Sequence, residues 1–444
     1  MSMFREENGR RHRSSTASGI LLFALLSGCA TGGAKAPASE LVSSGWSDPA
    51  ALAPAGSFDA YVAAVTTELR VHRVPFDPSK AEAELASVAP FRMPPDPRCG
   101  PGKPRGIAIL VHGLSDTAFA MRDLANSLAR QCFEARALLL PGHGTRPADL
   151  MVVDENDWVR HVQAAVLQAR RDNDVVVVAG FSLGAALAVT VAAEAPGSVD
   201  AVIGVSPAYR ISSSLLARQA RWLGVFRPWL DSGPREEFAR YEAMPARGIA
   251  STMALLDRMN ARVRAQGGVQ VPWMVVQSED DEVIDVTGNR RFFASKADDP
   301  RSVFLNYVSE PSEDRADERV TWLPAADPGS RVAGLSHLAL HIAPENPHYG
   351  LEGAYRNCGS APFREESEVQ VCRQAEQVWY GTGRQSPPPG EAGARATFNP
   401  HYPDLERRIG GFLAEIDGRH ADRSASLQEG TGLGSHAQSS TRRR

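Results

Sequence analysis

The chain has 444 residues, of which 43% are hydrophobic and 23% charged, and its formal net charge is −4. This is the composition of a globular protein that can bury a large core in one big domain or two smaller ones. Lysine and arginine form no stripe outside the two ends of the chain. The sequence therefore gives no support for a nucleic-acid partner.

Residues 1–28 have the pattern of a signal peptide. Arginines among the first 13 residues precede an apolar run from Gly19 to Leu26, which is too short to span a bilayer permanently. The ending Leu-Ser-Gly-Cys resembles the bacterial lipoprotein cleavage box. This resemblance implies that Cys29 is lipidated and anchors the protein in the cell envelope, and Ala30 favours the outer membrane. A secreted protein in which Cys29 is incidental is the alternative.

The regions that flank the main body are expected to contribute little regular structure. Residues 29–57 are rich in Ala, Gly, Ser and Pro, which predicts a flexible tether. Residues 58–104 predict an irregular lead-in, because a helical pattern from Phe58 to Val71 is followed by repeated prolines. The polar stretch 418–444 is expected to be disordered.

Between residues 105 and 417, strand patterns alternate with helix patterns. Strands are expected over 106–111, 135–140, 175–179, 199–205 and 271–277, with helices over 121–130 and 157–170 between the first of them. This alternation predicts an α/β fold with a mostly parallel, doubly wound sheet. Residues 208–270 predict a small helical cap, whose apolar side chains either pack on the main domain or line an acyl pocket.

Four cysteines remain after Cys29, and an exported protein meets conditions in which disulfides persist. Their sequence positions allow three pairings. We favour the two local ones, Cys99 with Cys132 and Cys358 with Cys372. The second would close a short loop and contribute about 3 kcal/mol in the chain-entropy model.

The most informative motif is Gly180-Phe181-Ser182-Leu183-Gly184, which lies between a β-branched run and an alanine-rich stretch. A serine at such a strand-to-helix turn has a strained backbone, and side chains two positions away on either side would collide with the turn. Glycine at both positions removes these collisions. The motif predicts that Ser182 is a nucleophile, with an ordinary tight turn as the alternative.

The strand end Val111-His112-Gly113-Leu114 is the candidate partner of this turn. Acyl transfer needs N–H donors aimed at the developing oxyanion, each worth about 3 kcal/mol of barrier. The residue after the nucleophile and the loop after the first strand supply such donors. We therefore expect the backbone N–H groups of Leu114 and Leu183 to form an oxyanion hole. His112 is expected to shape the loop, with a role as the base as the alternative.

The catalytic acid and base should follow later in the chain. Asp281 is the favoured acid, because it follows the strand 271–277 and precedes the apolar pair Val283 and Ile284. His337 is the favoured base, because small residues precede it as they would in a loop at a strand end. The alternatives that remain are Asp280, Asp285 and Glu279 for the acid, and His341 or a histidine elsewhere for the base.

These motifs together resemble the α/β-hydrolase superfamily, and within it the bacterial carboxylesterase and monoacylglycerol lipase group. The matching stretches, in order, are 110–114, 140–147 with Asp149, Leu150 and Trp158, the elbow at Ser182, and 271–284. The resemblance covers residues 105 to about 341 and a closing helix near 404–416. It implies a Ser182–His337–Asp281 triad that cleaves carboxylic esters through an acyl-enzyme, with no cofactor and no metal.

Two features depart from that family. Ala185 stands where many relatives have glycine, and the excursions 309–334 and 340–400 lie next to the expected histidine, where they could roof the active site. A peptidase, thioesterase or acyltransferase would use the same triad. A lipid-anchored binding lipoprotein without turnover is the non-enzymatic alternative. The expected partners are a small acyl ester and, through Cys29, a membrane.

Overall fold

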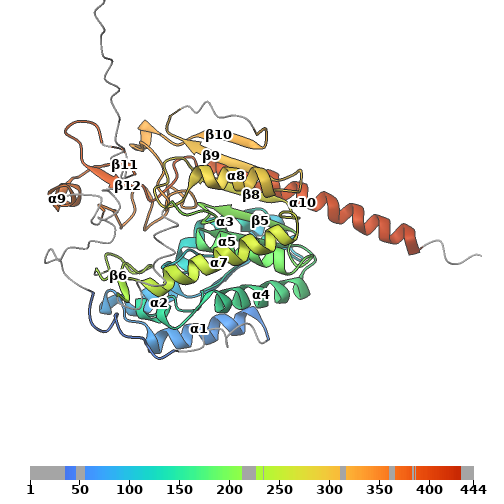
Figure 1. Ribbon diagram of the computed structural model, residues 1–444, viewed down its shortest axis with the longest axis horizontal. Coiled ribbons are helices and arrows are strands. Elements are labelled where there is room, and N and C mark those ends of the chain that lie inside the picture. The colour runs from blue at the N-terminus through green and yellow to red at the C-terminus, as the bar shows by residue number, and fades with distance from the viewer. Residues whose placement is uncertain are drawn as a thin grey trace, which may run out of the picture.

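The computed structural model describes residues 36–46, 56–212, 227–233, 235–310, 317–359, 366–382, 385 and 387–431 (Figure 1). Its centre is an eight-stranded sheet with the order β1-β3-β2-β4-β5-β8-β9-β10. Neighbouring strands are parallel except β1 and β3. The strands are β1 (Phe91–Met93), β2 (Gly106–Val111), β3 (Phe133–Ala137), β4 (Val176–Phe181), β5 (Ala201–Val205), β8 (Trp273–Ser278), β9 (Val303–Val308) and β10 (Val320–Pro324).

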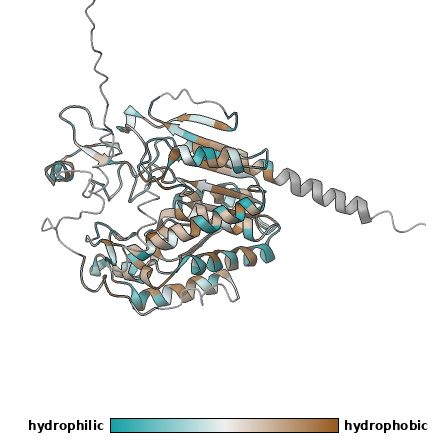
Figure 2. Cartoon of the chain, in the orientation of Figure 1, coloured by the Kyte–Doolittle hydropathy of each residue, from teal (hydrophilic) through white to brown (hydrophobic). Residues whose placement is uncertain are grey.

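The sheet is doubly wound, as predicted, because alternate residues of the central strands β2, β4, β5 and β8 belong to two different cores. In β2, Ile107 and Ile109 lie in one core and Ala108 and Leu110 in the other. The first core is closed by α1 (Phe58–His72), α2 (Ala81–Val88), α4 (Glu155–Asp172), α5 (Leu183–Glu194), α7 (Ala246–Ala265) and α8 (Val286–Lys296). The second is closed by α3 (Arg122–Arg130), α10 (Tyr402–Thr431) and residues of the 340–400 excursion. Figure 2 shows mixed hydrophilic and hydrophobic colouring along α1 and α4, as in helices with one face in solvent.

Strand β3 lies earlier in the chain than predicted. It was expected over 135–140, but it covers Phe133–Ala137. The N–H of Leu139 donates to the hydroxyl of Tyr61, and the N–H of Leu140 donates to the ring of His112. Because side chains satisfy these two N–H groups, the chain leaves the sheet although it remains buried.

The N-terminal segments are more ordered than the sequence suggested. Residues 36–46 fall in the expected tether, yet they dock on the body: Glu40 is buried and paired with Arg235 at 2.7 Å, and Ser43 donates to Asp149. The expected irregular lead-in contains α2 and also β1, an edge strand of the sheet. Cys29 lies outside the described residues, so lipidation stays a prediction. No helix in the described ranges combines the length and apolarity needed to cross a bilayer.

The expected cap is built mainly around α7, which packs against α5. Met253, Leu256 and Met259 on α7 belong to the first core, so these side chains pack on the main domain. A small antiparallel sheet, β6 (Trp229–Asp231) with β7 (Met244–Pro245), precedes α7. Residues 213–226 of the cap lie outside the described part of the chain.

The two excursions also contain regular elements. The first was expected as an insertion over 309–334, but it includes β10, which pairs with β9 as the last strand of the main sheet. The second contains α9 (Glu366–Gln374) and a parallel pair, β11 (Trp379–Gly381) and β12 (Gly393–Arg395). Helix α10 continues to residue 431 and so enters the stretch 418–444 for which disorder was expected.

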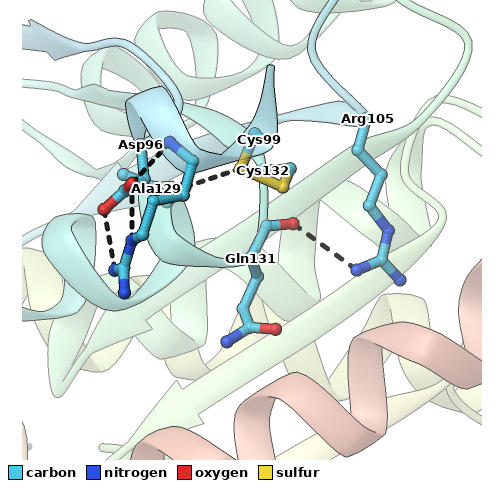
Figure 3. Close-up of a disulfide and its surroundings, with 7 residues drawn as sticks. Asp96, Cys99, Arg105, Ala129, Gln131 and Cys132 are labelled. Atoms are coloured by element: carbon cyan, nitrogen blue, oxygen red, sulfur yellow. Dashed lines mark hydrogen bonds and ion pairs between the residues drawn. A yellow bond between two sulfur atoms is a disulfide. The ribbon is translucent and has the colours of Figure 1, made fainter.

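Both favoured disulfide pairings are confirmed. Cys99 is bonded to Cys132 and Cys358 to Cys372, each with a Cα–Cα distance of 5.6 Å. Figure 3 shows the first bridge beside Asp96 and Ala129, where it joins the short helix η3 (Pro97–Cys99) to the residues that follow α3. The backbone N–H of Asp96 also donates to the carbonyl of Ala129 at 2.9 Å, so this contact is closed by two bonds.

Candidate active site

Ser182 lies between the end of β4 and the start of α5, in a backbone conformation that L-residues rarely adopt. Its φ is 52° and its ψ is −111°. The turn is held from both sides: the N–H of Ser182 donates to the carbonyl of Val205 at 3.0 Å, and its own carbonyl accepts from Ala185 and Ala208. Strain of this kind costs about 1–3 kcal/mol and persists only where the surroundings impose it.

The two glycines of the motif are required by close backbone contacts. A Cβ on Gly180 would lie 2.2 Å from the carbonyl carbon of Gly184, and a Cβ on Gly184 would lie 2.0 Å from the carbonyl oxygen of Val111. No flexible side chain is involved in either contact, so neither clash can be relieved by a rotamer change. The predicted reason, a collision within the turn, therefore holds for Gly180, whereas a Cβ on Gly184 would collide with the end of the neighbouring strand β2.

Three of the predicted residues meet at this turn, although they are far apart in the sequence. The Nε2 atom of His337 lies 2.9 Å from the Oγ of Ser182, and its Nδ1 lies 2.7 Å from Oδ2 of Asp281. In the tautomer with the proton on Nδ1, the ring donates to Asp281 and accepts from Ser182. This is the hydrogen-bond chain that activates a serine hydroxyl in serine hydrolases.

Asp281 is held as a carboxylate by its surroundings. Burial alone would raise its pKa, but the charge and hydrogen bond of His337 and the N–H groups of Val283 and Ile284 together outweigh burial. The net result is a pKa of Asp281 below its ordinary value. An ionised Asp281 can orient the imidazole and stabilise its positive charge.

The alternative acids and bases have other partners. Asp285 caps α8 by accepting from Gly288, Glu279 is paired with Arg290, and Asp280 accepts from Ser309 at 2.6 Å. His341 stacks on Phe181 with 4.1 Å between ring centroids, and burial, with a contribution from His337, lowers the pKa of His341 to about 3. None of these side chains makes a hydrogen bond to Ser182 within the described residues.

The loop that carries Leu114 lies directly against the elbow. A Cβ on Gly184 would come within 2.8 Å of the carbonyl oxygen of His112 as well as that of Val111. This contact brings the start of the loop beside Leu183. Neither the N–H of Leu114 nor that of Leu183 donates to another group in the described part of the chain. Both amides are thus available to a ligand oxygen, which is what an oxyanion hole requires.

Ser115, the next residue of this loop, is held by His143 and Tyr241, two residues that the sequence analysis did not identify as part of the site. Its φ is 69°, its N–H donates to Nε2 of His143 at 3.3 Å, and its carbonyl accepts from the N–H of Tyr241 at 2.8 Å. The sequence analysis assigned no role to His143. The only local signal for its role is its position between Gly142 and Gly144, both of which have φ of 80°.

His112 is a structural residue of the same loop. Its Nδ1 lies 2.8 Å from the carbonyl oxygen of Gly113, and its Nε2 accepts from the N–H of Leu140 at 3.0 Å. Nδ1 therefore makes a contact within the loop itself, and Nε2 joins the end of β2 to the segment that follows β3. Burial lowers the pKa of His112 well below its ordinary value, which also keeps the ring neutral.

With this geometry established, comparison with known proteins identifies the fold family. A family model described as serine aminopeptidase S33, of the Hydrolase_4 type, matches residues 102–304. The chain has an α/β-hydrolase fold. The matched range includes Ser182 and Asp281, whereas His337 lies beyond it.

Proteins similar in sequence to this chain include some that are named as lipases. It is 26% identical over 189 residues to a thermostable monoacylglycerol lipase of Bacillus sp. (strain H-257), covering 40% of this chain and 70% of that lipase. It is 25% identical over 234 residues to a monoacylglycerol lipase of Mycolicibacterium smegmatis, covering 48% and 83%. Among solved structures, a soluble variant of monoglyceride lipase from Saccharomyces cerevisiae is 17% identical with a TM-score of 0.42, covering 54% of this chain and 82% of that one.

Proposed function

We propose that this α/β-hydrolase is a serine hydrolase that cleaves carboxylic esters, with acylglycerol-like esters as its substrate class. The observation that supports this most directly is the pair of hydrogen bonds that joins Ser182, His337 and Asp281 at the strained turn. The monoacylglycerol lipases among the relatives support the choice of an ester as substrate.

The proposed reaction begins when Oγ of Ser182 attacks the acyl carbonyl while Nε2 of His337 takes its proton. The carbonyl oxygen becomes negative and receives the N–H groups of Leu114 and Leu183, each worth about 3 kcal/mol of barrier. His337 then gives its proton to the leaving alcohol, which produces an acyl-Ser182. A water molecule, deprotonated by the same ring, attacks the acyl group. His337 then returns this proton to Oγ of Ser182 as the bond to the acyl carbon breaks, and the carboxylic acid leaves.

A second candidate is cleavage of a peptide bond from an amino terminus, because the matching family model carries the name of a serine aminopeptidase. The same triad could perform either reaction. A panel of nitrophenyl esters with acyl chains of increasing length, compared with aminoacyl nitroanilides, separates the two. We expect turnover of the esters and none of the anilides.

A fluorophosphonate probe tests the nucleophile. We expect the wild-type protein to be labelled on Ser182, and labelling to be lost in Ser182→Ala. Ser295→Ala is the matched control, since Ser295 is exposed on α8, where its hydroxyl donates to the carbonyl of Phe292. Labelling of this variant should equal that of the wild type. A wild-type protein that is neither labelled nor active on any ester would overturn the proposal and favour a non-catalytic lipoprotein.

We also propose that Cys29 carries a lipid that holds the enzyme in the bacterial cell envelope, at the outer membrane. The support is the sequence pattern that ends at Cys29. The Cys29→Ala variant should move from the membrane fraction to the soluble fraction, with Cys358→Ser/Cys372→Ser as a control that stays in the membrane. Retention of Cys29→Ala in the membrane would contradict the anchor.

A further inference from the structure

The Asp281–His337 contact depends on two loops that come from distant parts of the chain. We call residues 279–285 the acid loop and residues 331–337 the histidine loop. One further part of the described chain touches both of them: residues 379–382, 385 and 387–396, which contain β11 and β12 and which we call the brace.

The brace is hydrogen-bonded along the histidine loop. The N–H of Tyr380 donates to the carbonyl of Arg331 at 2.8 Å, and the carbonyl of Tyr380 accepts from Ala333 at 2.7 Å. Further along, the hydroxyl of Ser336, the residue before His337, donates to the carbonyl of Ala396 at 2.6 Å. The histidine loop therefore behaves as an added strand at the edge of the small β11–β12 sheet.

The same segment reaches the acid loop through two side chains. The amide of Gln385 donates to Oδ1 of Asp280 at 3.1 Å, and Arg395 forms an ion pair with Glu282. Asp280 and Glu282 are the two neighbours of Asp281. The catalytic carboxylate is thus flanked on both sides by residues that the brace holds.

The acid loop, the histidine loop and the brace are in close contact around Gly334. A Cβ on Gly334 would lie 2.3 Å from the amide of Gln385 and 2.6 Å from Oδ2 of Asp280. Oδ2 of Asp280 also accepts from the N–H of Leu335 at 3.4 Å, which joins the two loops directly. A displacement of Gln385 would therefore displace residues of both loops.

The brace is itself tied to a disulfide. The N–H of Arg395 donates to the carbonyl of Asn357 at 2.7 Å, and the next residue, Cys358, is bonded to Cys372 in α9. These bonds connect the second excursion, residues 340–400, to the two loops that carry the acid and the base. The sequence had suggested instead that this excursion could cover the active site.

We propose that the brace is a positioning element of the catalytic site, which holds Asp281 and His337 at hydrogen-bonding distance through Gln385, Arg395 and the backbone of Tyr380. This inference rests on the proposed function, because it assigns a role to the brace only if Asp281 and His337 act on Ser182. Gln385 and Arg395 do not touch the reacting atoms. They are positioning residues, and their loss should reduce turnover without a matching change in substrate binding.

The test uses Gln385→Met and Arg395→Met in the full-length protein. We expect kcat on a nitrophenyl ester to fall by roughly 10- to 100-fold in each, the scale of a displacement of about 1 Å in a catalytic group, while KM stays within about twofold. The rate of fluorophosphonate labelling should fall by a similar factor. Arg395→Lys, which retains a cation for Glu282, should recover part of the loss.

The matched controls are Gln374→Met and Arg373→Met, the same substitutions at exposed positions of α9 in the same excursion. Both should keep wild-type kcat. The inference is overturned if Gln385→Met and Arg395→Met keep kcat within about threefold of wild type, or if they raise KM at constant kcat, which would make the brace part of the substrate site. Full activity of Ser182→Ala in the same assay would instead overturn the proposed function.

Discussion

Replacing Gly184 by alanine tests the packing of the elbow most severely. The added Cβ would lie 2.0 Å from the carbonyl oxygen of Val111 and 2.8 Å from that of His112, whereas ordinary contacts of a Cβ begin at 3.4 Å. Both oxygens belong to backbone at the end of β2, so α5 or the loop that carries Leu114 must move by more than 1 Å. Overpacking of this kind costs about 1–3 kcal/mol or more. Displacement of an oxyanion donor should lower kcat by a further 10²-fold or more.

Urea unfolding and ester turnover measure the two effects on the same preparation. Gly411→Ala is the control, because Gly411 is exposed in α10 and a Cβ there has nothing within 4 Å. That variant should be stabilised by about 0.5–1 kcal/mol, since alanine is the better helix former, and should keep full activity. If Gly184→Ala unfolds within about 0.5 kcal/mol of wild type and keeps kcat within threefold, the tight contact between elbow and oxyanion loop is refuted.

Three other outcomes follow from the structure. Asp281→Asn should lower kcat by roughly 10⁴-fold with little change in the fold, because an amide does not hold the imidazole in the productive tautomer. Steady-state kinetics measures the loss of kcat, and circular dichroism checks the fold. A kcat within tenfold of wild type would contradict this expectation. Burial lowers the pKa of His143 and His161 to about 4 and, with a smaller contribution from His337, that of His341 to about 3. Below pH 6.5 the unfolded chain therefore binds protons that the folded chain does not, so stability present above pH 6.5 should be lost on acidification by up to about 1.4 kcal/mol per pH unit for each ring. Urea unfolding between pH 7 and 5 measures this slope, and His341→Leu should make it shallower. An unchanged slope would mean that His341 binds as many protons in the folded state as in the unfolded state, which would contradict its lowered pKa. Finally, Cys358→Ser/Cys372→Ser should lose about 3 kcal/mol of unfolding free energy and, if the brace acts as proposed, kcat as well; a variant with wild-type urea midpoint and kcat would contradict both expectations.

The elbow and the two loops of the site could be predicted because their signals are local. Glycine at 180 and 184, an acid directly after a buried strand, and small residues before His337 are each visible within a few residues. Chain order then limited the choice of partners, and the structure brings the three favoured side chains together. The favoured disulfides were local in the same sense.

What the sequence did not predict depends on contacts between distant segments. The role of His143 comes from its bond to Ser115, and the end of β3 is set by the hydroxyl of Tyr61, which lies 78 residues before Leu139. Arg395 pairs with Glu282 although neither position carries a periodic pattern. Such partners have no signature in composition or spacing, so only the folded arrangement shows that the excursions join the sheet and the catalytic loops.

The most direct test of the proposed triad is a comparison of kcat/KM for Ser182→Ala, for His337→Ala and for the variant that carries both changes. If Ser182 and His337 act as one unit, each single change should lower kcat/KM by about 10⁴- to 10⁶-fold, and the double change should lower it no further. Losses that multiply in the double variant, or a His337→Ala protein with near wild-type activity, would show that the two side chains do not work together and would contradict the proposed mechanism.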